Sequence, residues 1–386
     1  MKKYDIIILG MGPAGMSVAK EFINTDYSVL LIDNSKITSS VVMTFMDGID
    51  KGMEKAIIIR YDSYSQQNRS VKIEVNGEGD TKLALMDIAK MRKIIKKEID
   101  FDNVQTEISG YIRQKHEIIL FDHNRKKYSA RLIIDCSGAK SLLAKPPENE
   151  VSYYGYAMLA NNCRIKDPKK VITYNSPDYT TSSIWIYPID KKTAQIGLLE
   201  QVYANPDPKE MHAKLSRAIS EIPDLKKILG KCRIGKKHDS HKYPLRLRKL
   251  VDDNIIFVGN SGGQATPFMG ECFRQATLLG KSAARVAKKA VDRNKFSKRS
   301  LSEYKKEWKK MVGKHYFTGT LARDILVRLD EEELKELTEK AKKLSDKEMM
   351  KVVRSELELP ILLKCMTPKM VWYLLHHLMN PVKRRK

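Results

Sequence analysis

The sequence lacks the features that mark disulfide-rich, secreted or membrane-spanning proteins. Its 5 cysteines show no CxxC spacing, and an odd count without a signal peptide argues against a disulfide framework. No stretch reaches the roughly 18 consecutive apolar residues that a membrane-spanning helix needs. The apolar run in MKKYDIIILG covers only about five residues and meets a glycine turn, so it predicts a strand rather than a secretion signal. We therefore expect a cytoplasmic protein that does not cross a bilayer, and no metal site.

The balance of charge is strongly positive and uneven. The chain has 386 residues, enough for two or three domains, and 42% hydrophobic content to form their cores. Its net charge is +24, and from Arg285 to the end there are 27 Lys and Arg against 14 Asp and Glu. This excess indicates an anionic partner, either a lipid surface or a nucleic acid. The alternative is that the lysines merely cover solvated helix faces.

A glycine motif follows the first expected strand. Gly10, Gly12 and Gly15 form GxGxxG between a strand and a helix, where they allow a tight turn, close approach of a pyrophosphate and helix-strand packing. Asp33 ends the next strand, where its carboxylate can accept hydrogen bonds from a ribose. A carboxylate there disfavours NADP, so this half of the pattern leaves NAD and FAD open.

A second strand, loop and helix, IIFVGNSGGQATPFMGECFRQATLLGKSAARVAKKA, spans residues 255 to 290. A nicotinamide enzyme has no need of a distant second unit of this type. FAD is longer, and its ribityl chain and isoalloxazine ring need a second anchor. The two units together therefore predict FAD, with a substrate domain inserted between them.

The motifs resemble a known family. Gly-x-Gly-Pro-Ala-Gly, IIDCSGAKSLLA and VGNSGGQATPFMGECFRQA are similar to flavoproteins of the p-hydroxybenzoate hydroxylase type, and among them to geranylgeranyl reductases of isoprenoid lipids. The family's second loop reads Gly-Asp-Ala-Ala-Gly, then Pro, then a glycine cluster. Here Asn260 replaces the Asp, and Glu271 and Cys272 stand where the family has glycines. The resemblance covers nearly the whole chain, more loosely in the middle third.

The resemblance implies a set of FAD ligands. Asn260 would face the ribityl chain, and backbone near Cys272 and Phe273 would face the flavin ring. Arg92, on an amphipathic helix expected over residues 86 to 99, resembles the family's FAD-contacting arginine, and Ile108 is a candidate for contact with adenine. The expected cofactor-binding residues are Gly10, Gly12, Pro13, Ala14, Gly15, Asp33, Arg92, Ile108, Gly259, Asn260, Gly263, Pro267, Gly270, Cys272 and Phe273.

The same resemblance implies the reaction, the reduction of isoprenoid double bonds by hydride from flavin N5 with protonation of the other carbon. SSIWIYP is similar to a strand whose Trp185, Tyr187 and Pro188 would line the substrate tunnel; otherwise these residues form ordinary sheet core. Candidates for the catalytic acid are Tyr187, Glu200 and Cys272. The electron donor, NAD(P)H or ferredoxin, would visit transiently. The cysteine-containing, glycine-rich segment usual in the family is missing from KITSSVVMTFMDG, residues 36 to 48.

The expected fold class is α/β, in four parts. Residues 1–150 form a Rossmann-like FAD-binding domain with a β-hairpin insertion at about 40–85, whose turn is NGEGD, and 251–298 complete that domain. Residues 151–250 form an antiparallel-sheet substrate domain. Residues 299–386 are helical and resemble archaeal lipid reductases, ending in MVWYLLHHLM and PVKRRK. This end is expected to contact an anionic membrane surface, unless the helix packs on the core.

Three other functions stay open. A redox-neutral lycopene cyclase-like enzyme would use Glu200 as its acid, although the cyclase pattern has two carboxylates. A monooxygenase or halogenase would share the flavin site. A nucleic-acid-binding flavoprotein acting on tRNA would explain the positive charge, but no RNA-binding module is recognisable, so nucleic acid is an unlikely partner.

Overall fold

A computed structural model describes residues 2–34, 36, 41–68, 71–114, 117–148 and 150–379. Part of the segment over 36 to 48 and the terminal PVKRRK lie outside the described residues. Among the described residues, no helix combines the length and apolarity needed to cross a bilayer.

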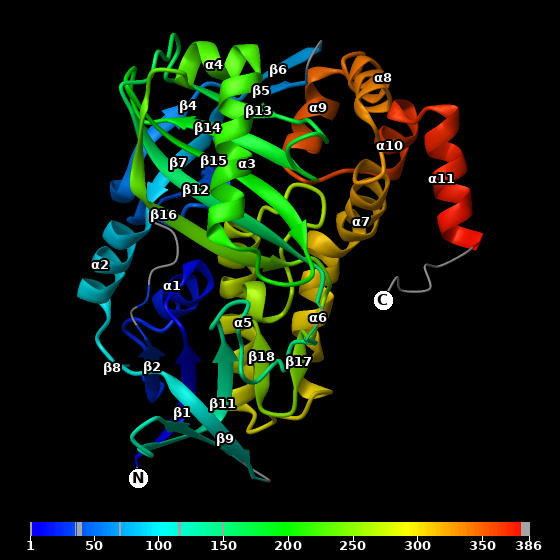
Figure 1. The fold of residues 1–386 in the computed structure, drawn as a ribbon. Coiled ribbons are helices and arrows are strands. Elements are labelled where there is room, and N and C mark those ends of the chain that lie inside the picture. Colours follow the sequence, from blue (N-terminus) through cyan, green and yellow to red (C-terminus); the bar gives the residue numbers. More distant parts are fainter. Residues whose placement is uncertain are drawn as a thin grey trace.

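The nucleotide-binding half is built on an eight-stranded sheet, at the bottom of Figure 1. β1 (Lys3–Leu9) lies between β11 (Lys127–Asp135) and β2 (Val29–Asp33), and all three run parallel. Their Ile, Val and Leu runs are almost fully buried, because helices or loops cover both faces. The other strands of this sheet are β8 (Asp102–Gln105), β9 (Ile108–Arg113), β10 (Ile118–Asp122), β17 (Val251–Asp252) and β18 (Ile255–Phe257).

Two helices from distant parts of the chain pack together on this sheet (Figure 1). α1 (Pro13–Lys20) follows β1, and α5 (Phe273–Asp292) follows β18. β18 pairs in parallel with β11, so the late unit enters the same sheet as the early one. This arrangement is the Rossmann-like α/β fold that the two glycine motifs predict.

The aromatic runs of the middle third form one large sheet, as expected. β12 (Ser152–Asn161) pairs antiparallel with β15 (Thr193–Val202) and β16 (Arg233–Pro244). β14 (Ser183–Pro188) and β13 (Lys170–Tyr174) continue it. Helices α3 (Pro208–Glu221) and α4 (Pro223–Leu229) cover one face through a core of Ile, Leu and Met side chains. The opposite face is left for the cofactor loops and the C-terminal helices.

The insertion near residues 40–85 differs from the expected hairpin. β5 (Ser63–Gln67) and β6 (Lys72–Asn76) pair with each other, and β5 extends the large sheet beside β13. β3 (Val41–Phe45), β4 (Ile57–Tyr61) and β7 (Leu83–Asp87) form a separate small sheet. NGEGD therefore joins strands of two different sheets, and its prediction as a hairpin turn is wrong. Alternation of apolar residues identifies strands but not their partners.

The C-terminal region is helical throughout its described part and lies beside the large sheet (Figure 1). Asp330 and Ser345 begin two of its helices with reciprocal side-chain caps to Glu333 and Glu348. α11 stands at the outer edge. The elements are α6 (Glu303–Trp308), a π-helical turn (Lys309–Gly313), α7 (Lys314–Leu326), α8 (Glu331–Ala341), α9 (Asp346–Val353), α10 (Leu359–Cys365) and α11 (Pro368–Met379).

Candidate functional site

The first glycine loop has the geometry of a dinucleotide site. Gly10 has a positive φ of 95°, and a Cβ there would lie 2.6 Å from the carbonyl oxygen of Cys136. At Gly15 a Cβ would lie 1.9 Å from the carbonyl oxygen of Gly10, so only glycine allows this packing. At Gly12 a Cβ would meet no described atom within 4 Å, and no described side chain caps the helix that begins at Pro13. The free helix N-terminus and the open backbone fit a pyrophosphate.

Asp33 and Arg92 meet at the carboxyl edge of this sheet. The Asp33 carboxylate accepts a hydrogen bond of 2.9 Å from the Met11 amide and forms an ion pair with Arg92 of α2 (Ile88–Glu98). Both residues are 8% exposed. The Thr106 amide donates to the carbonyl of Asp33 over 3.1 Å, which brings the start of β9, with Ile108, to the same edge. The structure thus gathers three expected cofactor residues that the sequence singled out separately.

The second loop touches the first helix. Gly259, Gly263 and Gly270 have positive φ angles of 70°, 68° and 68°. A Cβ at Gly259 would lie 3.4 Å from the side chains of both Ala14 and Ala276. The two strand-loop-helix units, about 250 residues apart in the chain, are therefore in contact, as an FAD site made of both would require. Pro267 follows in the same loop.

A buried ion pair that the sequence analysis missed holds the second loop in place. Arg248 pairs with Glu150, and both side chains are 6% exposed. The same guanidinium donates to the carbonyl of Asn260 over 3.2 Å and to that of Ala139 over 2.8 Å. No pattern in the sequence predicts this ion pair, because Arg248 lies in an irregular segment and Glu150 is 98 residues away.

The strand that ends in IIDCSG supplies a second clamp. The buried Asp135 carboxylate accepts hydrogen bonds from the hydroxyls of Ser137 and Ser141, and its carbonyl accepts one from Ser261. Gln264 accepts from the Gly259 amide over 2.7 Å and donates to the carbonyl of Phe257 over 2.8 Å. Burial raises the pKa of Asp135, and the two serines oppose this shift. The motif was visible in the sequence, but its role in fixing the loop was not.

The residues expected near the flavin ring lie at the N-terminus of α5. The Cys272 thiol is 3.0 Å from Oδ1 of Asn260, which can accept its hydrogen bond. Burial raises the pKa of Cys272 to about 12 and raises that of Tyr187 too, so both hold their protons at neutral pH. Burial also raises the pKa of Glu271, to about 7, so this carboxyl changes charge near neutrality. Phe273 is buried as the first residue of the helix.

The remaining candidates divide between the two faces of the large sheet. The rings of Trp185 and Tyr187 stack 5.8 Å apart, and Trp185 packs over Gly197, where a Cβ would lie 2.3 Å from the indole. Glu200 instead forms an ion pair with Lys214 of α3, so it belongs to the opposite face. The Pro188 carbonyl accepts a hydrogen bond from Tyr61 over 2.8 Å. The structure does not bring Glu200 together with Tyr187 and Cys272.

An apolar cavity of about 190 Å³ lies between the large sheet and the C-terminal helices. We call it the apolar channel. Phe268 and Met269 of the second glycine loop line it at one end, and Met370 of α11 lines it too. Trp185, Tyr187 and Pro188 do not belong to its described lining, although Tyr187 packs in the same cluster as Tyr64 and Met269. Side chains that give the channel its apolar character include Leu326, Leu337, Ala341, Met349, Leu362 and Met366.

Comparisons with known proteins agree with the predicted resemblance. The chain is 24% identical to digeranylgeranylglycerophospholipid reductase 1 of Methanosphaera stadtmanae, over 92% of this chain and 93% of that protein. It is 21% identical to the digeranylgeranylglycerophospholipid reductase of Thermoplasma volcanium, over 88% and 91% of the two chains. No protein-family model matches the chain.

Solved structures show the same fold. A geranylgeranyl bacteriochlorophyll reductase-like protein from Thermoplasma acidophilum superimposes with a TM-score of 0.79 at 16% identity, covering 99% of this chain and all of the other. A halogenase solved in complex with FAD gives 0.67 at 10% identity, over 99% and 93% of the chains. The predicted fold class is confirmed.

A pair of alanine substitutions tests the cofactor loop. Gly15→Ala should lower the free energy of unfolding by about 1–3 kcal/mol and abolish FAD uptake, because the methyl group has no space. Gly12→Ala should leave the Tm of the FAD-free protein unchanged but weaken FAD binding about tenfold or more. Thermal unfolding and a fluorescence titration with FAD measure the two effects. Parental FAD affinity in Gly12→Ala would contradict the site.

Proposed function

We propose that this chain is an FAD-dependent oxidoreductase that reduces the isoprenoid double bonds of membrane lipids or their precursors. The observation that carries the proposal is that the loop of Phe268 and Met269, which lines the apolar channel, continues directly into Cys272 and the N-terminus of α5. An apolar chain in the channel would thus reach the place where the second half of the FAD site begins. The reductase names of the full-length relatives support the same substrate class.

The residues that would hold FAD come from both units. The N-terminus of α1 and the open backbone at Gly12 would receive the pyrophosphate, and Asp33 would accept from the ribose. Asn260 would face the ribityl chain, and the positive end of the α5 dipole would lie near the ring. FAD supplies the hydride. The transient electron donor, NAD(P)H or ferredoxin, stays part of the proposal.

An isolated alkene requires a dry and oriented site. It is a poor hydride acceptor, so hydride delivery to one carbon has to be coupled to protonation of the other. The leucine and methionine lining of the apolar channel would exclude water and align the chain.

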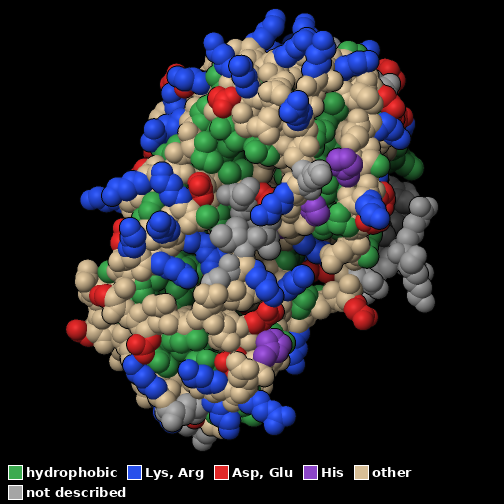
Figure 2. All heavy atoms as spheres, turned by 60° about the vertical axis from the view of Figure 1, so that its left-hand side comes forward, with side chains coloured by type: hydrophobic (Ala, Val, Ile, Leu, Met, Phe, Trp, Pro, Cys, Tyr) green, Lys and Arg blue, Asp and Glu red, His purple; other side chains and the backbone are tan. Residues whose placement is uncertain are grey.

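Two observations weigh against the other functions. Glu200, the acid of the cyclase alternative, is paired with Lys214 on the sheet face away from Trp185 and Tyr187. Figure 2 shows Lys and Arg spread over the whole face in view. Nucleic-acid binding would instead favour positive charge gathered in one stripe. A monooxygenase or halogenase would share the fold and the flavin site, so the mass of the product distinguishes it from a reductase.

The outer surfaces of α10 and α11 support peripheral membrane binding. Leu362 and Met370 of these helices face the channel, whereas their other sides expose Leu363 and Trp372, the latter by 58%. The exposed apolar residues of the two helices are Leu359, Leu363, Val371, Trp372 and Leu375. Together with the net charge of +24, this surface suits an anionic bilayer from which a lipid chain could enter the channel.

The reaction itself is tested by product mass. Purified protein loaded with FAD and reduced anaerobically with dithionite should convert geranylgeranylated lipids into products heavier by two hydrogens for each double bond reduced. A cyclase would leave the mass unchanged, and a monooxygenase supplied with oxygen would add an oxygen atom. Unchanged masses for every isoprenoid offered would remove the proposal.

Filling the apolar channel should block long substrates. Ala341→Trp places an indole among the channel-lining side chains and should lower kcat/KM for geranylgeranyl lipids at least about tenfold, since overpacking a channel excludes the chain. FAD content should stay parental. The matched control is Ala213→Trp on the exposed side of α3. Equal loss in both variants, or none in Ala341→Trp, would contradict the assignment of the channel.

The membrane surface is tested with vesicles. The parent protein should sediment with anionic vesicles at low salt and be released as salt screens the attraction. Trp372→Ser combined with Leu375→Ser should reduce the bound fraction several-fold, because about 25 cal/mol is lost for each Å² of apolar surface that no longer inserts. Tyr203→Ser removes an equally exposed aromatic group elsewhere and should have no effect. Identical sedimentation of all three proteins would contradict the proposed surface.

A further inference from the structure

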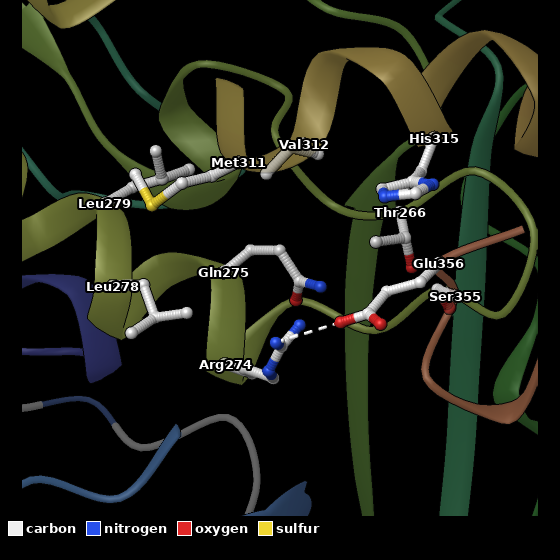
Figure 3. A pocket seen from close by; sticks show the side chains of 10 residues that line it. All are labelled: Thr266, Arg274, Gln275, Leu278, Leu279, Met311, Val312, His315, Ser355 and Glu356. Carbon is white, nitrogen blue, oxygen red and sulfur yellow. Dashed lines mark ion pairs between the residues drawn. The ribbon is translucent and has the colours of Figure 1, made fainter. Parts of the chain in front are cut away.

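The loop from Thr266 to Cys272 separates two cavities, of which only the second has charged residues in its described lining. Phe268 and Met269 line the apolar channel, whereas Thr266 lines a second cavity of about 240 Å³ between α5, α7 and the segment after α9. We call the second cavity the polar chamber. Its lining residues, drawn in Figure 3, are Thr266, Arg274, Gln275, Leu278, Leu279, Met311, Val312, His315, Ser355 and Glu356.

Ion pairs fix one side of the polar chamber. Arg274 pairs with Glu356 over 2.9 Å, the contact drawn as a dashed line in Figure 3, and with Asp47 over 2.8 Å. Arg354 also pairs with Asp47, over 2.6 Å. The positive charge of Arg274 is therefore already balanced, and the chamber offers no free cation of α5 to an anionic ligand.

The chamber is surrounded by polar atoms whose hydrogen bonds are not completed by the described residues. Oε1 of Gln275, Nδ1 of His315 and Oγ of Ser355 are buried and have no partner among those residues. Gln275 and Ser355 are only 5% and 6% exposed. An unsatisfied buried polar atom costs about 1–3 kcal/mol, and water bound in this cavity would supply the missing hydrogen bonds.

Glu271 connects this chamber to the loop beside the cofactor site. The Glu271 amide donates to the Thr266 hydroxyl over 3.0 Å, and the Glu271 carbonyl accepts from the Thr266 amide over 2.8 Å. Its carboxylate accepts from Nε2 of Gln275 over 2.7 Å, while its other oxygen is buried without a described partner. The next residue is Cys272, whose thiol contacts Asn260 on the expected flavin side.

We propose that the polar chamber is a water-filled route for proton entry and that Glu271 relays protons from it toward the reacting double bond. The inference rests on the proposed function. In each turnover the π bond breaks, hydride from the reduced flavin forms a C–H bond at one carbon, and a proton forms the second C–H bond at the other. The described lining of the apolar channel includes no carboxylic acid to supply that proton. Glu271, left as a carboxylate, regains a proton from the chamber water.

The surroundings of Glu271 set the pH dependence. Burial raises the pKa of Glu271 to about 7, and the charge of Asp47 adds to the rise. The charge of Arg274 opposes it, as do the hydrogen bonds that the carboxyl accepts from Gln275 and from the Arg274 amide. Cys272 stays neutral beside Glu271, and Gln275, which hydrogen-bonds the Glu271 carboxylate, lines the chamber together with His315 and Glu356. Because the relay needs protonated Glu271, the reduction rate should fall as pH rises through about 7.

Gln275 gives the relay a directional test. Gln275→Leu removes a hydrogen bond that favours the charged carboxylate, so the pKa of Glu271 should rise and the inflection should move to higher pH. Glu271→Gln should abolish the inflection and slow reduction about a hundredfold. Glu303→Gln, which alters an exposed ion pair with Lys289 near the other end of α5, is the matched control and should behave as the parent.

Two measurements separate this inference from the proposed function. Infrared difference spectra of the FAD-free proteins across pH 7 should show the carbonyl band of a buried carboxylic acid in the parent and in Glu303→Gln, but not in Glu271→Gln. Single-turnover reduction by the dithionite-reduced, FAD-loaded proteins should give the pH profiles above. Absence of the band in the parent, or the same profile in Glu271→Gln, overturns the relay. A parent that shows the band but reduces no isoprenoid lipid overturns the proposed function instead.

Discussion

The site depends on one contact, the close approach of helices α1 and α5, where a glycine leaves room for the neighbouring helix. A Cβ at Gly280 of α5 would lie 3.0 Å from the carbonyl oxygen of Ala14 and 3.0 Å from Cβ of Ser17, and the Ser17 hydroxyl donates to the carbonyl of Thr277 over 2.8 Å. A larger residue at Gly280 would push the two units apart, and the proposed dinucleotide site needs both of them. The rest of the fold serves to bring about this contact across about 250 residues of chain.

Polar clamps convert that contact into a fixed geometry. Arg248 and Glu150 form a buried ion pair whose guanidinium also holds carbonyls of two loops. Asp135 and Gln264 fix the same loop from the side of the sheet. Each of these buried groups is hydrogen-bonded to a partner. Removing a partner of Arg248, Glu150 or Asp135 would leave a buried charge without compensation, which is strongly destabilising.

The second glycine loop also divides the interior by polarity. On one side, Phe268 and Met269 meet the leucines and methionines of the C-terminal helices. On the other, Thr266 and Gln275 line the polar chamber, and the Glu271 carboxylate accepts a hydrogen bond from Gln275. A reaction that joins a hydride and a proton to an apolar chain needs both environments within a few residues of each other. Asp47 pairs with Arg274 of α5 and with Arg354, which follows α9. These ion pairs fix the C-terminal helices relative to α5, and so fix the positions of the two cavities relative to each other.

The sequence alone predicted the two strand-loop-helix units, the α/β fold class and a flavin as the cofactor. These features follow from local chemistry, since glycine spacing, a carboxylate after a strand and runs of buried residues act within a few positions. Tertiary structure decided which residues face one another. Glu200 and Tyr187 both lie on strands of one sheet, yet the two faces separate them, because side chains alternate and only packing selects the inner face. The channel, the Arg248–Glu150 clamp and the chamber beside Glu271 arise between elements distant in the chain, where no local pattern records the contact.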